Sequence, residues 1–178
     1  MSAEQPRRHL VSALVVDRPG TLNRVAGLFR ARSFNIESLT VGSTLHRGRS
    51  RMTVVIRGDE AHLHQVLAQL ERLIDVIEVR DLTHAPRVEL ELALVELEAP
   101  GDPAATAALT ALVERSGGAV ISSDDECWRV RLTAAPAQIE DALDALRSHG
   151  LRSLVRAGSV AMATGAPSLT TQIGASTP

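Results

Sequence analysis

The sequence predicts an α+β protein built from two tandem βαββαβ units. The first reason is hydrophobic periodicity, because apolar residues alternate in some segments and recur every three to four positions in others. The second is an internal repeat, since Pro100-Gly101 follows a predicted strand 81 positions after Pro19-Gly20 follows another. The third is size, because 178 residues of which 44% are hydrophobic can form two small cores.

The first unit follows from periodicity and turn residues, taken in chain order. Its second helix is expected to be capped by Gly58-Asp59, because a short polar residue satisfies free amides at a helix start. The pattern predicts a buried strand at 10–16, a helix at 22–32, an extended segment at 35–45, a hairpin loop at 46–49, a strand through 52–56, a helix through 63–70 and a closing strand near 74–82.

The second unit repeats this order after a polar joint. The pattern predicts a strand from 88, a helix from Asp102-Pro103 to a C-cap at Gly117, a strand through 128–132, a helix from Pro136 to Gly150 and one final strand within 151–162. In the first of these strands the apolar residues change from even to odd positions at Leu94-Val95. We predict a β-bulge there, and an exposed apolar face for a partner is the alternative.

Domain boundaries follow from these segments. We expect a flexible N-terminus at 1–8, a first domain at 9–82, a linker at 83–86, a second domain at 87–162 and a disordered tail, rich in small and polar residues, at 163–178.

Charge and composition limit the possible partners and location. A net charge of −2 gives no electrostatic reason to expect nucleic acid or an anionic membrane. The sequence has no signal-peptide pattern and no apolar run long enough to span a membrane, so we expect a cytoplasmic protein. The single cysteine, Cys127, is predicted to be a small core residue rather than a metal ligand.

The segment 17–22, Asp-Arg-Pro-Gly-Thr-Leu, has the properties of an anion-binding loop. Gly20 has no side chain, so a ligand can approach the backbone closely. The first turn of the following helix contains no acidic residue, although acids are favoured there by the helix dipole. The amides of this turn are therefore predicted to be available to an external anion.

No pattern in the sequence indicates catalysis. The motifs of nucleophilic hydrolases, phosphate-binding loops, dinucleotide-binding folds and zinc sites are missing from the sequence. Four glutamates at 89, 91, 96 and 98 are predicted to form a solvated strand face. RNA binding is a further alternative, because the same element order builds an RNA-recognition fold, but only Phe29, Phe34 and Trp128 could stack on bases.

Several of these segments together resemble a known family. A strand-end Asp-x-x-Gly leading into a helix within a βαββαβ order resembles the ACT module, a ferredoxin-like unit that binds amino acids. Asn35-Ile36-Glu37-Ser38-Leu39 followed by Ser50-Arg51-Met52-Thr53 resembles the regulatory small subunit of acetolactate synthase. The resemblance covers residues 9–82 well and 83–162 more weakly. It implies two tandem ferredoxin-like units, the first of them an ACT domain.

The resemblance implies a regulatory function without catalysis. The chain would bind L-valine, mediate feedback inhibition and activate a catalytic large subunit in valine, leucine and isoleucine synthesis. Thiamine diphosphate, magnesium and FAD would belong to that large subunit, and this chain would hold no cofactor or metal. A stand-alone ACT-type amino-acid sensor is the alternative.

A zwitterionic ligand needs donors, acceptors and an apolar recess. The amides of Gly20, Thr21 and Leu22 are candidate donors for its carboxylate, and Asp17 and Asn35 are candidate acceptors for its ammonium group. Leu22 and Ile36, with Val41, are candidates for the recess. In the family the ligand lies between two ACT modules, which implies that Asn35 and Ile36 come from a neighbouring chain of a homodimer or higher oligomer. In the second unit, Asp102 would repel a ligand carboxylate, so no site is expected there.

Overall fold

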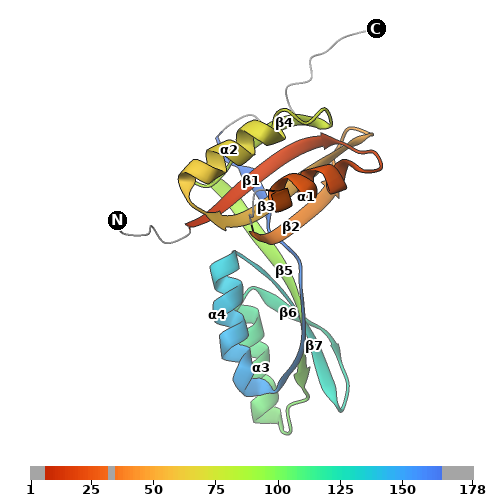
Figure 1. The fold of residues 1–178 in the computed structure, drawn as a ribbon. Helices are drawn as coiled ribbons and strands as arrows, with labels where there is room; N and C mark the ends of the chain where they lie inside the picture. The colour runs from red at the N-terminus through yellow and green to blue at the C-terminus, as the bar shows by residue number, and fades with distance from the viewer. Residues whose placement is uncertain (1–6, 32–34, 166–178) are drawn as a thin grey trace, which may run out of the picture. The chain divides into compact units, whose positions relative to one another are not determined.

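The computed structural model describes residues 7–31 and 35–165. The chain divides into two compact units, one formed by residues up to Val88 together with those from Ala161 onward, and the other by residues 89–160 (Figure 1). Each unit contains the βαββαβ order, so the prediction of an α+β protein with two such units is confirmed.

The first unit is one antiparallel sheet with two helices. Its elements are β1 (Arg7–Val16), α1 (Thr21–Ala31), β2 (Asn35–Ser43), β3 (Arg49–Gly58), α2 (Glu60–Leu70) and β4 (Val76–Asp81). The strand order is β2-β3-β1-β4, and α1 and α2 lie together on one face of the sheet (Figure 1). This order leaves β2 and β4 at the two edges.

The core of the first unit lies between the sheet and these helices. Alternate residues of β1 point to this side, and Val11, Ala13 and Val15 are buried there with Val25 and Phe29 of α1. The side chain of Phe29 has 0% exposure, and burying an aromatic of this size contributes about 1.5–3 kcal/mol. The apolar residues that alternate along β1 and those that recur along α1 therefore pack into one core.

The opposite face of the same sheet is partly covered by the end of the described chain. Leu10 and Val55 pack there against Leu82 and against Ala161 of β9 (Val160–Ala163), which pairs with β5 (Arg87–Glu98). One final strand was predicted within 151–162, whereas the structure has two, β8 (Leu151–Arg156) and β9. The second of these returns to the first unit, which periodicity alone does not indicate.

The second unit has the same construction. Its other elements are α3 (Pro103–Arg115), β6 (Gly118–Ser123), β7 (Cys127–Ala134), α4 (Pro136–Leu146) and a short 3-10 helix (Arg147–His149). The strands are ordered β6-β7-β5-β8. Inward residues of β5 and β7 pack against Leu109 and Val113 of α3 and Ile139 of α4. Cys127 is 6% exposed, as expected of a small core residue.

The predicted β-bulge at Leu94-Val95 is wrong. β5 pairs with β7 in unbroken register from Glu91 to Glu98. Its ladder with β8 shifts between Glu96 and Leu97, but the extra residue there, Arg152, belongs to β8 and not to β5. Odd-numbered residues point into the core throughout the paired part, whereas the earlier apolar residues point outward: Val88, Leu90, Leu92 and Leu94 are 38–52% exposed. The switch in the sequence therefore marks an apolar outer face, which was the alternative reading.

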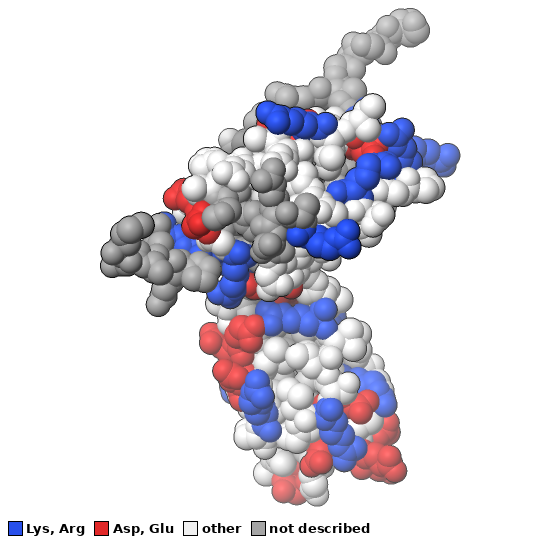
Figure 2. All heavy atoms as spheres, in the orientation of Figure 1, with Lys and Arg blue, Asp and Glu red and all other residues white. Residues whose placement is uncertain are grey.

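The ends of the chain lie mostly outside the described residues. The flexible segment predicted at 1–8 and the disordered tail predicted at 163–178 can be followed only at Arg7-Arg8, which begin β1, and at 163–165. No helix within the described ranges is both long and apolar enough to cross a membrane. Acidic and basic side chains are interspersed over the face of the second unit that Figure 2 shows.

Candidate functional site

The loop between β1 and α1 is fixed at its start by two neighbouring loops. The amide of Val16 donates to the carbonyl of Asp75 at 2.8 Å, and the amide of Asp17 donates to the carbonyl of Gly48 at 2.8 Å. Asp75 belongs to the turn between α2 and β4, and Gly48 to the hairpin between β2 and β3. Three loops therefore meet at the end of the sheet where the anion-binding segment lies.

Gly20 adopts the conformation that only glycine takes readily. Its φ is +89°, and a side chain at this φ costs about 1–2 kcal/mol. Its carbonyl accepts the amide of Arg24 at 3.0 Å, which begins the hydrogen bonding of α1. The first turn of α1 contains no acidic residue. The sequence thus places an exposed, glycine-containing loop at the N-terminus of α1, the positive end of the helix dipole.

Two of the three predicted amide donors lack a partner. Among the residues that the structure describes, the amides of Gly20 and Leu22 make no hydrogen bond within the protein. The amide of Thr21 donates to the carbonyl of Arg18 at 3.2 Å. The Thr21 side chain is 3% exposed, and its hydroxyl has no partner in the described part of the chain. An anion over this loop would therefore meet the amides of Gly20 and Leu22.

A buried carboxylate beside this loop joins two arginines. Asp75 is 1% exposed and forms ion pairs with Arg18 and Arg24. Arg24 also donates from Nε to Asp75 Oδ2 at 2.5 Å. The sequence pattern does not indicate that Arg24 and Asp75 are partners, because they are separated by 51 positions and neither belongs to the motif. Asp75 stands in the turn directly before β4, where an acidic residue is ordinary, so no local signal marks it.

The predicted site residues form two separate groups in one chain. Asp17 and Leu22 are exposed at the loop, and Leu22 is 46% exposed. Asn35 lies opposite Arg57, which lies opposite Arg8, at the other end of β1. The eight steps from Arg8 to Val16 correspond to about 26 Å at about 3.3 Å per residue. One chain therefore does not bring Asn35 and Ile36 to Gly20.

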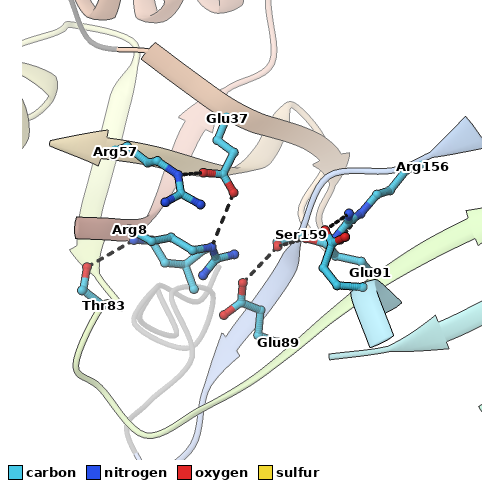
Figure 3. Close-up of polar contacts among 10 residues, drawn as sticks. Arg8, Glu37, Arg57, Thr83, Glu89, Glu91, Arg156 and Ser159 are labelled. Carbon is cyan, nitrogen blue, oxygen red and sulfur yellow. Dashed lines mark hydrogen bonds and ion pairs between the residues drawn. The ribbon is translucent and has the colours of Figure 1, made fainter. Parts of the chain in front are cut away.

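The second group lies on the edge strand β2. Asn35 is exposed, while Ile36 is half-buried and packs against the core of the first unit. Next to them Glu37 accepts from Arg57 Nε at 2.5 Å and lies 3.9 Å from Arg8 Nε (Figure 3). Ser38 has a buried hydroxyl without a partner among the described residues. An open strand edge of this kind can pair with another chain.

The matching loop of the second unit is already occupied by its own side chain. Asp102 is the N-cap of α3, and its Oδ1 accepts the amide of Ala105 at 2.8 Å. The negative side chain predicted at this helix start is therefore present and satisfies a helix amide itself. That no amino acid binds there stays a prediction.

A buried polar cluster holds β5, β8 and the segment after it together. Arg156 Nε donates to Glu91 Oε2 at 2.6 Å, and the hydroxyl of Ser159 donates to Glu91 Oε1 at 2.7 Å (Figure 3). Burial would lower the pKa of Arg156, but hydrogen bonds to Glu140 and Glu91 outweigh it and raise the pKa. Glu91 was predicted to be solvated, whereas its side chain is 7% exposed. Both carboxylate oxygens of Glu91 accept hydrogen bonds from the protein, so its role is structural.

An open groove in the second unit was not indicated by the sequence. It has a volume of about 580 Å³ and is lined by residues of both helices and the nearby strand ends, among them Leu112, Arg115, Thr133, Gln138 and Asp141. Its lining mixes one basic, one acidic and several apolar side chains without a cluster of buried polar groups.

The described residues offer little to a metal or to RNA. Within 7–31 and 35–165, no three His, Cys, Asp or Glu side chains are grouped so that they could hold a metal ion. Phe29 is enclosed in the core and Trp128 packs against the core of the second unit, so neither is presented for base stacking. Phe34 lies outside the described residues.

Comparisons with known proteins agree with this architecture in both units. Residues 11–78 match the family of the AHAS small subunit-like ACT domain, and residues 90–165 match the family of the small subunit of acetolactate synthase. The two matches cover the glycine-containing loop and the second unit separately.

Similar chains align with this one over most of their length. The chain is 40% identical to a probable acetolactate synthase small subunit of Methanothermobacter thermautotrophicus, over 90% of this chain and 95% of that one. It is 36% identical to the acetolactate synthase small subunit of Aquifex aeolicus, over 89% and 82% of the two chains. The crystal structure of the small subunit from Thermotoga maritima superposes with a TM-score of 0.80 at 33% identity, covering 90% of this chain and 99% of that one. The chain therefore belongs to the family of acetolactate synthase small subunits, and its first unit is an ACT domain.

Proposed function

We propose that this chain binds L-valine at the β1–α1 loop of its ACT domain and thereby regulates a catalytic acetolactate synthase subunit. The proposal depends mainly on the loop itself: Gly20 at φ +89° opens it, and the amides of Gly20 and Leu22, which have no partner among the described residues, lie at the start of a helix whose first turn has no acidic residue. A carboxylate is the ligand group that such donors favour.

The binding site is completed by a second copy of the chain. The loop supplies the carboxylate contacts, with Asp17 and the buried Thr21 at its two sides, while Asn35 and Ile36 of a neighbouring β2 edge supply an acceptor for the ammonium group and apolar contact. The separation of about 26 Å within one chain, at about 3.3 Å per residue along β1, supports this division. Valine binding then changes how two ACT domains sit together, which is the link to feedback inhibition.

The second unit serves as an interaction module. Support comes from the outer face of β5, where Leu90, Leu92 and Leu94 are 38–42% exposed. Apolar side chains grouped on one face of a sheet are typical of a surface that is covered in an assembly. The chain has no catalytic task in this scheme, and thiamine diphosphate, magnesium and FAD belong to the large subunit. Synthesis of branched-chain amino acids then takes place in the cytoplasm.

A stand-alone amino-acid sensor is the second candidate. The match of residues 90–165 to the acetolactate synthase small-subunit family favours the regulatory subunit over it. Calorimetric titration of the purified chain with L-valine tests the ligand, and addition of the chain to a catalytic large subunit, with and without valine, tests the partner. Absence of heat on titration would refute valine binding, and unchanged activity of the large subunit would refute the regulatory role.

A further inference from the structure

Arg24 lies beside Gly20 with one nitrogen of its guanidinium unused. A Cβ atom placed on Gly20 would lie 3.2 Å from Arg24 Nη1. The other two nitrogens, Nε and Nη2, both engage the carboxylate of Asp75. Within the described residues Nη1 has no partner. The free nitrogen therefore lies at the open space that the absent side chain of Gly20 leaves.

Asp75 fixes this guanidinium before any ligand arrives. Its side chain is 2% exposed, and it also pairs with Arg18 of the loop. Its backbone carbonyl accepts the amide of Val16 at 2.8 Å, so the residue is held to the end of β1. A buried carboxylate that binds two of the three nitrogens leaves the third in one orientation, which lowers the entropic cost of binding.

The charges of this group favour an anion. Arg18 and Arg24 contribute two positive charges and Asp75 one negative charge, which leaves one positive charge beside Gly20. Guanidinium groups pair with carboxylates through charge-assisted hydrogen bonds. Asp17, which is exposed in the same loop, supplies the opposite charge that an ammonium group requires. The arrangement fits a zwitterion with a free carboxylate.

We propose that Arg24 is the anchor of the effector's carboxylate and that Asp75 is its positioning residue. This inference rests on the proposed function, because it concerns the same loop. Arg24 Nη1 joins the amides of Gly20 and Leu22 around the carboxylate, while Asp75 keeps the guanidinium turned toward it. The effector class is therefore an α-amino acid with an ionised carboxylate, and its amide derivative binds poorly.

The test compares L-valine with L-valinamide, which retains the side chain and the ammonium group but lacks the negative charge. Calorimetric titration of the full chain should show that the wild type prefers valine by at least about 100-fold, because Arg24 and the two amides all bind an ionised carboxylate more strongly than a neutral amide. Arg24→Gln should reduce this preference by about tenfold, which corresponds to one charge-assisted bond, and Arg24→Lys should reduce it less. Arg30→Gln, at the other end of α1, is the matched control and should keep the full preference.

Loss of Arg24 leaves the buried Asp75 with one partner fewer and can destabilise the fold. A second variant therefore controls for stability. The double variant Arg24→Gln/Asp75→Asn removes both charges, so its melting temperature should lie closer to that of the wild type than the melting temperature of Arg24→Gln does, while its preference for valine stays reduced. Asp75→Asn alone should reduce the preference, because the guanidinium is no longer held.

The possible results distinguish the role of Arg24 from valine binding itself. A full preference for valine in Arg24→Gln, or an equal loss in Arg30→Gln, would overturn the role of Arg24 while valine binding stands. A wild-type chain that binds neither compound would overturn the proposed function as well.

Discussion

Gly20→Asp is the most direct test of the anion-binding loop. The φ of +89° makes any side chain at this position cost about 1–2 kcal/mol of folding free energy. The new Cβ would lie 3.2 Å from Arg24 Nη1, so the added carboxylate reaches the guanidinium and occupies the place of the ligand. The substitution thus combines backbone strain with an internal competitor.

The loss of affinity follows from the contacts that disappear. Two amides donate to the ligand carboxylate in our proposal, and each charge-assisted bond contributes about 1.5–3 kcal/mol, or about 3–6 kcal/mol together. Because 1.4 kcal/mol corresponds to a factor of ten, we expect valine affinity to fall by at least about 100-fold. Gly20→Ala adds the backbone strain without the charge, so it should lose less valine affinity than Gly20→Asp.

The assay is calorimetric titration with L-valine, combined with thermal unfolding of each variant. Gly27→Ala is the matched control: Gly27 lies within α1, and a Cβ there would meet nothing within 4 Å. This control should stabilise the fold by about 0.5–1 kcal/mol and leave valine affinity unchanged. Wild-type affinity in a folded Gly20→Asp variant would refute the location of the site, and equal loss in Gly27→Ala would show a general effect of helix α1.

Three further predictions concern the second unit. Asp102→Ala removes the cap of α3 and should lower the free energy of unfolding by about 1 kcal/mol in a denaturant titration, with valine affinity unchanged; lower affinity would indicate a second site. Leu92→Arg places a charge on the outer face of β5 and should weaken activation of the large subunit in an activity assay without lowering the melting temperature, and full activation would exclude this face as the interface. Burial raises the pKa of the Cys127 thiol, so iodoacetamide should label it slowly in the folded chain at neutral pH and rapidly in urea, whereas rapid labelling of the native chain would contradict its core position.

The elements of the fold were predictable because local pattern decides them. The spacing around Val25 and Phe29 predicted α1, and the alternation in β1 predicted a strand with one face in the core. The strand β5 shows where this reasoning fails. Leu90, Leu92 and Leu94 resemble core residues in sequence, yet they point outward, since alternation specifies two faces and not which of them is buried.

The sequence by itself determined the βαββαβ order, the glycine-containing loop before α1 and the absence of an acid from its first turn, because these depend on residues close together in the chain. Tertiary structure alone decided that Asp75 meets Arg24 across 51 positions, that β9 returns to the first unit, and that Asn35 lies at the far end of the sheet from Gly20. The physical reason is that strand pairing and burial are set by partners distant in sequence, and a local pattern carries no information about which partner it meets.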